Sequence, residues 1–308
     1  DFKNNLNSFK ETLNKNLNLK SYFDLHKWSV ENKSQFWKEI WKFTKIIGNL
    51  KGKIFIENDN FINSKFFEES ELNYAENCLS KADDTDAIIF YSENNLRRSI
   101  TWNKLRENVF KLSNYFKLNQ INKNDRIAAV LPNLPETVIS FLATAQIGAI
   151  WSSCSSDFGQ QAIIDRFKQI EPKILIVTDY YYYNNKKINT TNIVPRILKN
   201  IPSIKKVIVI PYEKKKANLD DGFKYIEWIK IIEKKEINST FEKFQFNHPL
   251  YILYSSGTTG IPKCIVHGAG GSLIQHKKEH QIHCNINEND KVFYFTTCGW
   301  MMWNWLIS

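Results

Sequence analysis

The chain has 308 residues, of which 43% are hydrophobic and 24% charged, and its formal net charge is +10. This composition is that of an ordinary globular protein. The chain has no run of about 18 apolar residues that could cross a membrane, and its five scattered cysteines exclude a disulfide framework. The polar N-terminal segment is not a secretory signal, so we expect a cytoplasmic protein.

The positive charge does not by itself indicate a nucleic-acid partner. Only six of the 42 basic residues are Arg, and the lysines are dispersed along the chain. Surfaces that read phosphates usually cluster their basic residues and favour Arg. The abundance of Lys, Asn, Ile, Phe and Tyr is explained by A/T-rich codons. We therefore expect neither a nucleic-acid nor a membrane partner, and keep a basic nucleic-acid-binding protein as a minor alternative.

The first eighty residues are expected to be helical and loop-like. Apolar side chains at helical spacing predict an amphipathic helix over 35–44. Trp28, Trp37 and Trp41 suggest that this region packs on a larger body. We therefore divide the chain into an N-terminal segment, 1–80, and a main domain, 81–308.

From about Asp83 onwards, short apolar runs alternate with helical patterns. This alternation predicts an α/β domain with mainly parallel sheets flanked by helices. Two polar insertions, 180–190 and 213–221, are expected to be surface loops. The predicted strands are Ala87–Tyr91, Arg126–Leu131, Ala149–Trp151, Ile174–Val177, Val207–Ile210 and Leu250–Tyr254. The predicted helices are 102–116, with Thr101 as its N-cap, 134–146 and 160–169.

The segment from Leu253 to Lys263 carries the clearest chemical signal. An apolar strand runs into Ser255-Ser256-Gly257-Thr258-Thr259-Gly260-Ile261-Pro262-Lys263. Glycines allow a close backbone approach, while N–H groups, hydroxyls and a lysine can surround a polyphosphate. The spacing is not that of a Walker loop, because Pro262 precedes the lysine and Cys264 follows it. A flexible linker is the alternative, but apolar β-runs on both sides argue against it.

This segment resembles the phosphate loop of the acyl-adenylate-forming superfamily, which includes the acyl-CoA synthetases. The resemblance implies the fold of the large N-terminal domain of that superfamily. It also implies ATP as a substrate, with Mg²⁺ on its phosphates. The residues implied to contact the ATP phosphates are Ser255, Ser256, Gly257, Thr258, Thr259, Gly260 and Lys263.

Three further segments narrow the resemblance. Leu25–Val30 is similar to the N-terminal segment of short-chain acyl-CoA synthetases. Trp151–Gly159 resembles a segment that helps to contact CoA, which implicates Phe158 and Gly159. The form Cys-Gly-Trp-Met-Met-Trp-Asn-Trp over 298–305 resembles the acetoacetate–CoA ligases. By that resemblance Gly299, Trp300 and Met301 lie near the bound acid, although Trp300 could instead fill the core.

The implied reaction joins acetoacetate to CoA through an acyl-adenylate, with release of AMP and pyrophosphate. Relatives are about twice as long, so we expect the N-terminal half of a longer enzyme, inactive alone and with no catalytic residue of its own. A strand near Val292–Phe295 and the Trp/Met-rich tail are expected to lack their partners. The alternatives are an acetyl- or propionyl-CoA synthetase-like ligase and a non-catalytic nucleotide-binding protein.

Other reactive residues are assigned structural roles. The run from Gln275 to Cys284 contains three histidines but lacks the His-Glu-x-x-His order of a zinc site. We expect a helix beside the phosphate loop and no metal ligand among these residues. Cys264 and Cys298 are expected to be buried structural thiols. Tyr182 falls where relatives are expected to have a CoA-contacting Arg.

Overall fold

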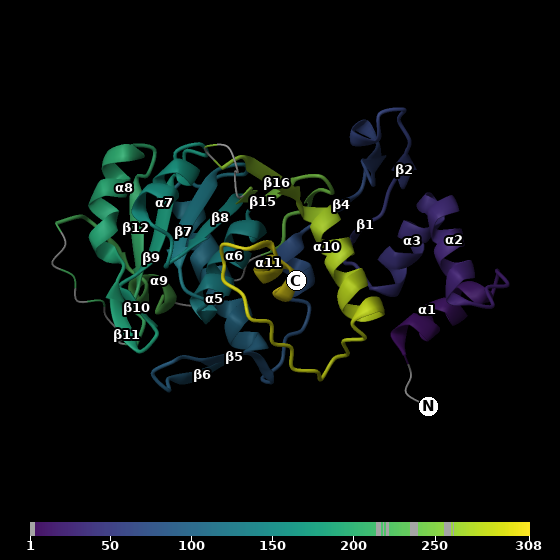
Figure 1. Ribbon diagram of the computed structural model, residues 1–308, viewed down its shortest axis with the longest axis horizontal. Coiled ribbons are helices and arrows are strands. Elements are labelled where there is room, and N and C mark those ends of the chain that lie inside the picture. The colour runs from purple at the N-terminus through teal and green to yellow at the C-terminus, as the bar shows by residue number, and fades with distance from the viewer. Residues whose placement is uncertain are drawn as a thin grey trace.

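A seven-stranded sheet forms the centre of the chain (Figure 1). The computed structural model describes residues 4–213, 217, 219, 222–234, 240–255, 260 and 262–308. The strand order is β13-β12-β9-β7-β8-β15-β16, and only the β15–β16 pair is antiparallel. This arrangement confirms the predicted α/β class. The strands are β7 (Arg126–Leu131), β8 (Ile150–Ser155), β9 (Ile174–Thr178), β12 (Lys206–Ile210), β13 (Ile226–Glu227), β15 (Pro249–Tyr254) and β16 (Cys264–Gly268).

Helices cover both faces of this sheet because alternate side chains of each strand point to opposite sides. In β7, Ile127 and Ala129 belong to one buried cluster, while Ala128 and Val130 belong to another. Helices α5 (Trp102–Leu118) and α6 (Pro135–Gln146) contribute to the first cluster, and α7 (Gln160–Phe167) and α8 (Val194–Asn200) to the second. The predicted N-cap is confirmed, since Thr101 accepts a hydrogen bond from the backbone N–H of Lys104 at 3.2 Å.

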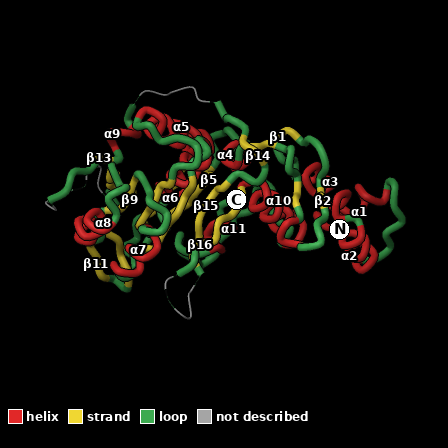
Figure 2. The backbone as a smooth tube through the Cα atoms, turned by 90° about the horizontal axis from the view of Figure 1, so that it is seen from above, coloured by secondary structure: helices red, strands yellow, loops and turns green. Residues whose placement is uncertain are grey.

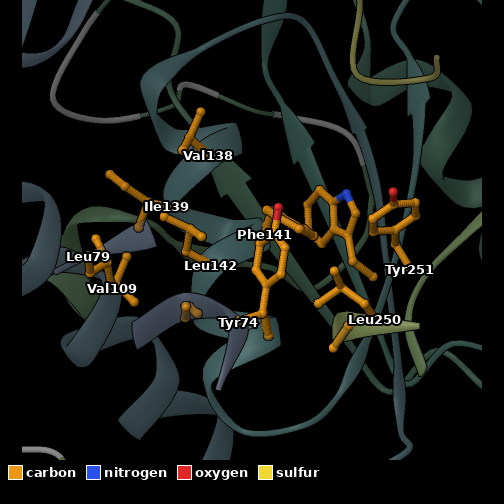
Figure 3. Packing of buried hydrophobic residues seen from close by; sticks show 14 of the residues in the cluster. Tyr74, Leu79, Val109, Val138, Ile139, Phe141, Leu142, Leu250 and Tyr251 are labelled. Carbon is orange, nitrogen blue, oxygen red and sulfur yellow. The ribbon is translucent and has the colours of Figure 1, made fainter. Parts of the chain in front are cut away.

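Phe141 of α6 stands at the centre of the first cluster (Figure 3). Its ring makes edge-to-face contacts with Tyr74, Trp151 and Tyr251, at centroid distances of 5.5, 6.1 and 6.1 Å. Aromatic pairs in this arrangement add stability beyond the apolar area that they bury. They join α4 (Tyr74–Cys78) to α6 and to the adjacent strands β8 and β15.

The N-terminal helices lie at the opposite end of the molecule from α7 and α8 (Figures 1 and 2). They are α1 (Asn5–Asn14), α2 (Tyr22–Glu31) and α3 (Lys33–Phe43), and α3 corresponds to the predicted amphipathic helix. Trp41 of α3 is buried against Phe67 and Phe246, with centroid distances of 5.3 and 6.2 Å. This packing explains why the region is rich in Trp and Phe.

Short strands make up the remaining sheets. A three-stranded sheet has the order β1-β4-β14, and β2–β3 and β5–β6 form separate antiparallel pairs. Their bounds are β1 (Gly48–Asn49), β2 (Phe55–Ile56), β3 (Lys65–Phe66), β4 (Glu71–Leu72), β5 (Asp86–Tyr91), β6 (Arg97–Thr101) and β14 (Phe244–Gln245). The remaining helical elements are η1 (Phe61–Asn63), η2 (Thr191–Ile193), α9 (Ile229–Ile232), α10 (Ala269–Lys278), η3 (Glu279–His283) and α11 (Met301–Leu306).

The insertion at 180–190 is a β-hairpin, so the prediction of a surface loop was wrong there. Strand β10 (Tyr180–Tyr183) pairs with β11 (Lys186–Asn189), and Tyr180 and Tyr181 are buried. Asn184 and Asn185 both have positive φ angles, 49° and 59°, as a tight two-residue hairpin turn requires. The second insertion, 213–221, lies largely outside the described residues.

The segment Val292–Phe295 is not a strand, contrary to the prediction. In the described part of the chain no strand pairs with it, so its backbone has no ladder to join. Phe293 and Phe295 are 83% and 92% exposed. Within the same residues, no helix combines the length and the apolar character that a bilayer span demands.

Candidate functional site

The predicted phosphate loop begins where β15 ends, at the carboxyl edge of the parallel strands. Of its predicted contact residues, Ser256, Gly257, Thr258 and Thr259 lie outside the described residues. The two ends of the loop are joined. The backbone N–H of Ser255 donates to the carbonyl of Lys263 at 3.0 Å, and the N–H of Lys263 donates to Ser255 Oγ at 3.1 Å.

The side chain of Lys263 is free to meet an anion. It is exposed, and none of the ion pairs between described residues includes it. Gly260 has a φ angle of 154°, a conformation that side chains rarely allow. A cation and a permissive glycine therefore stand at the second half of the loop.

Gln169, just after α7, braces the far side of the loop. Its Nε2 donates to the carbonyl of Pro262 at 2.9 Å, and its Oε1 lies 3.6 Å from Cys264 Sγ. Cys264 is exposed, so the prediction of a buried thiol was wrong for this residue. The reason is that β16 is the edge strand of the sheet, and its first residues have an uncovered face.

Arg166 connects the loop strand with the predicted CoA segment. Its guanidinium lies 5.0 Å from the ring centre of Phe158 and 5.7 Å from that of Tyr254. It donates to the carbonyl of Ala162 at 2.8 Å, but it has no carboxylate partner in the described part of the chain. No motif in the sequence identifies Arg166 as a site residue, because a single Arg in an amphipathic helix forms no recognisable pattern.

The end of the chain crosses the same edge of the sheet. Cys298 is fully buried, and its Sγ donates to the carbonyl of Leu131 at the end of β7, at 3.0 Å. Ser153 of β8 donates to the carbonyl of Cys298 at 2.6 Å. Burial raises the pKa of the Cys298 thiol to about 12, so this group is an inert structural thiol, as predicted.

The predicted acid-pocket residues follow Cys298 directly. A Cβ on Gly299 would lie 3.2 Å from the backbone nitrogen of Ser155 and 3.4 Å from Phe158 Cζ. The predicted acid and CoA segments therefore touch, although they lie far apart in the sequence. Trp300 and Met301 are 60% and 46% exposed, so Trp300 does not fill the core. Trp303 is the core residue of this segment, and its Nε1 donates to Asn133 Oδ1 at 2.9 Å.

Gly159, the second predicted CoA contact, is the N-cap of α7. A Cβ placed there would meet nothing within 4 Å. Packing inside the described chain therefore does not require glycine at this position.

The histidines of α10 and η3 are held separately. His276 Nδ1 lies 2.7 Å from Ser308 Oγ, and the ring of His280 packs edge-on against Trp305 at 4.5 Å. His283 Nδ1 lies 3.4 Å from the carbonyl of Lys278. Among the residues that the structure describes, no group of three or more His, Cys, Asp or Glu side chains is placed to hold a metal ion.

Known proteins resemble this chain over most of its length. The profile of the family described as AMP-binding enzyme matches residues 75–307. Acetoacetyl-coenzyme A synthetase of Rhizobium meliloti (strain 1021) is 44% identical over 291 residues, which cover 93% of this chain and 44% of that protein. Acetoacetyl-CoA synthetase of Gallus gallus is 40% identical over 303 residues, which cover 95% of this chain and 45% of that protein.

A solved structure shows the same fold. The acetoacetyl-CoA synthetase from Streptomyces lividans superposes with a TM-score of 0.92 and 31% sequence identity, covering 99% of this chain and 47% of that one. The chain thus spans a little less than half of the length of the relatives that it matches.

Proposed function

Because the chain belongs to the AMP-binding enzyme family, we propose that it forms the N-terminal part of an enzyme that joins acetoacetate to CoA. The acid carboxylate attacks the α-phosphorus of ATP, an oxygen–phosphorus bond forms, and pyrophosphate leaves. The CoA thiolate then attacks the acyl carbon, a carbon–sulfur bond forms, and AMP leaves. The observation that carries the proposal is the Cys298–Trp303 segment, which follows the acetoacetate–CoA ligase pattern and lies against β7 and β8 at the predicted site.

The phosphate loop is proposed to hold the ATP phosphates. Negative charge grows on the leaving pyrophosphate, and preorganised donors at this position stabilise it. Ser255 and Lys263 supply a hydroxyl and an ammonium group, and Ser256, Gly257, Thr258, Thr259 and Gly260 are assigned to the same loop. The described residues of the loop offer no carboxylate. A Mg²⁺ ion accompanying ATP would therefore take oxygen ligands from the phosphates and neutralise part of their charge.

The acid and CoA sites are proposed to share the edge of β8. Gly299, Trp300 and Met301 would form one wall of the acid pocket, and Phe158 and Gly159 would contact CoA. The position of Gly299 supports this assignment, because a Cβ there would lie 3.4 Å from Phe158 Cζ and the acyl carbon must meet both the acid pocket and the thiol. The unpaired charge of Arg166 beside Phe158 favours anionic substrates there.

The test is AMP formation by the complete enzyme with acetoacetate, acetate, propionate or butyrate. We expect kcat/KM for acetoacetate to exceed that for acetate at least tenfold. Preference for acetate or propionate would contradict the assignment of acetoacetate as substrate, while the assignment as an acid–CoA ligase would still hold. ATP binding without AMP formation from any acid would indicate a non-catalytic nucleotide-binding protein.

A matched pair of variants tests the loop. Lys263→Ala should raise the KM for ATP in ATP–pyrophosphate exchange about tenfold, through loss of one charge-assisted contact. Lys168 is an exposed lysine outside the loop, so Lys168→Ala should leave the KM for ATP unchanged. Equal KM values for ATP in the two variants would contradict the assignment of Lys263 to the ATP site.

A further inference from the structure

A cavity lies among the N-terminal helices, away from the carboxyl edge of the sheet. Its volume is about 210 Å³, and its walls come from α1, α2, α3, the end of α10 and η3. Its inner wall is apolar and includes Phe9, Leu25, Phe36, Ile40 and Ile282. In Figure 1, α1, α2 and α3 occupy the end of the molecule opposite to α7 and α8, and α10 runs between them and the sheet. The cavity therefore belongs to none of the sites proposed above.

The rest of the cavity lining is polar and basic. It includes His26 and Ser29 of α2, together with Lys278 and His283 from the end of α10 and η3. Lys278 is partly buried, and its Nζ lies 5.7 Å from the ring centre of Trp37. Burial lowers the pKa of Lys278, so desolvation disfavours its charge.

Only Glu279, the next residue, offsets part of the cost of burying this cation, and burial has the larger effect on its pKa. Lys278 takes part in none of the ion pairs between them. The nearest acid in sequence, Glu279, accepts hydrogen bonds from Gln275 at 2.6 Å and from Trp305 at 2.8 Å. A partly desolvated ammonium group with no ion-pair partner among the described residues is costly, and an anion that reaches it from the cavity would offset that cost.

The backbone of the cavity wall is unusual as well. Glu279–His283 is a π-helix that directly continues α10. Such turns are rare and are frequent at functional sites. This turn contributes both Ile282 and His283 to the lining, so it places an apolar and a basic side chain on the same cavity.

We propose that this cavity binds a monocarboxylate with an apolar tail, the tail against the apolar wall and the carboxylate beside Lys278. A cavity of roughly 150 Å³ takes up benzene, so this one suits a tail of about six to eight carbons. Octanoate is the probe of choice. Octanol tests the contribution of the carboxylate, and octylamine tests the sign of the charge.

The binding test uses isothermal titration calorimetry on the complete protein without ATP, CoA or acetoacetate. Octanoate should bind at least tenfold more tightly than octanol or octylamine. Ser29→Leu fills the cavity from α2 without removing a core side chain. It should lower the affinity for octanoate at least tenfold. The control is Lys27→Leu, which changes an exposed side chain two residues earlier on α2. This variant should bind octanoate as tightly as the wild type does.

A second pair of measurements isolates the charge. Lys278→Met keeps the apolar stem and loses the ammonium group. The affinity for octanoate should therefore fall about tenfold, while the affinity for octanol stays unchanged. If Ser29→Leu melts early, Ser29→Met provides the same filling with a more adaptable side chain. Three results would each overturn the proposal. They are equal affinities for octanoate and octanol, an undiminished affinity for octanoate in the Ser29 variants, and no heat of binding when octanoate is added to the wild type.

Discussion

The hydroxyl of Ser153 donates to the carbonyl oxygen of Cys298 at 2.6 Å and joins two segments separated by 145 positions. The same Oγ accepts a hydrogen bond from Trp151 Nε1 at 3.0 Å. Ser153 is buried in β8, next to the strand that leads into the phosphate loop. A single buried hydroxyl thus fixes where the Gly299–Met301 segment crosses the sheet.

Ser153→Ala is therefore expected to destabilise the chain and to loosen this segment. The substitution leaves the Trp151 N–H and the Cys298 carbonyl without their partner, at a cost of about 1–3 kcal/mol in the free energy of unfolding. Urea unfolding measures this cost. Ser156→Ala is the control, because Ser156 Oγ is buried without a hydrogen-bond partner among the described residues and its removal should be nearly neutral. Similar losses for both variants would show that the hydrogen bond to Cys298 has no special weight.

Gly299→Ala should disturb the acid pocket more than the overall fold. The new methyl group would lie 3.2 Å from the backbone of Ser155, which a strand holds in place, and 3.4 Å from Phe158. We expect a loss of about 1 kcal/mol in stability and a rise of several-fold in the KM for the acid. Gly271→Ala on α10 meets nothing within 4 Å and should stabilise the helix by about 0.5–1 kcal/mol. An unchanged KM in Gly299→Ala would contradict the pocket assignment.

The buried His276 should make stability depend on pH. Burial, assisted by His280 and His267, lowers its pKa from 6.5 to about 4. Between these values the unfolded chain binds a proton that the folded chain does not, so the free energy of unfolding falls as the pH drops from 6.5 towards 4. This one group accounts for a loss of about 3 kcal/mol at most.

Urea titrations at pH 7, 6 and 5 measure this slope. His276→Gln should make it shallower, while His283→Gln, an exposed control, should leave it as in the wild type. An unaltered slope in His276→Gln would assign the pH dependence to other groups.

The five thiols should fall into distinct reactivity classes. Cys264 and Cys284 are exposed, whereas Cys154 and Cys298 are buried and burial raises the pKa of both. Cys78 is intermediate in exposure, and burial raises its pKa to about 12, so it should react slowly. Under native conditions a thiol reagent should label Cys264 and Cys284 quickly and reach Cys154 and Cys298 only on unfolding. Peptide mapping by mass spectrometry locates the label. Rapid native labelling of Cys298 would contradict its place beneath the acid segment.

Features that depend on neighbouring residues alone can be predicted from the sequence. Alternating or continuous apolar runs predicted the strands at 126–131 and 174–177, because each strand buries side chains on two faces of the sheet. Thr101 marked the start of α5 because a threonine hydroxyl caps a free backbone N–H. The pattern of glycines and hydroxyls over 255–263 indicates a phosphate loop without reference to any tertiary contact.

Which of these features meet in space depends on packing between distant parts of the chain. The space beside Gly299, where a Cβ would meet Phe158, and the placement of Arg166 over Phe158 and Tyr254 depend on strand order, which no local pattern specifies. The exposure of Cys264 depends on β16 being the edge strand, and an apolar run looks the same at the edge as in the centre of a sheet. Apolar periodicity records that a residue can be buried, while its actual neighbours are set by packing over long separations in the chain.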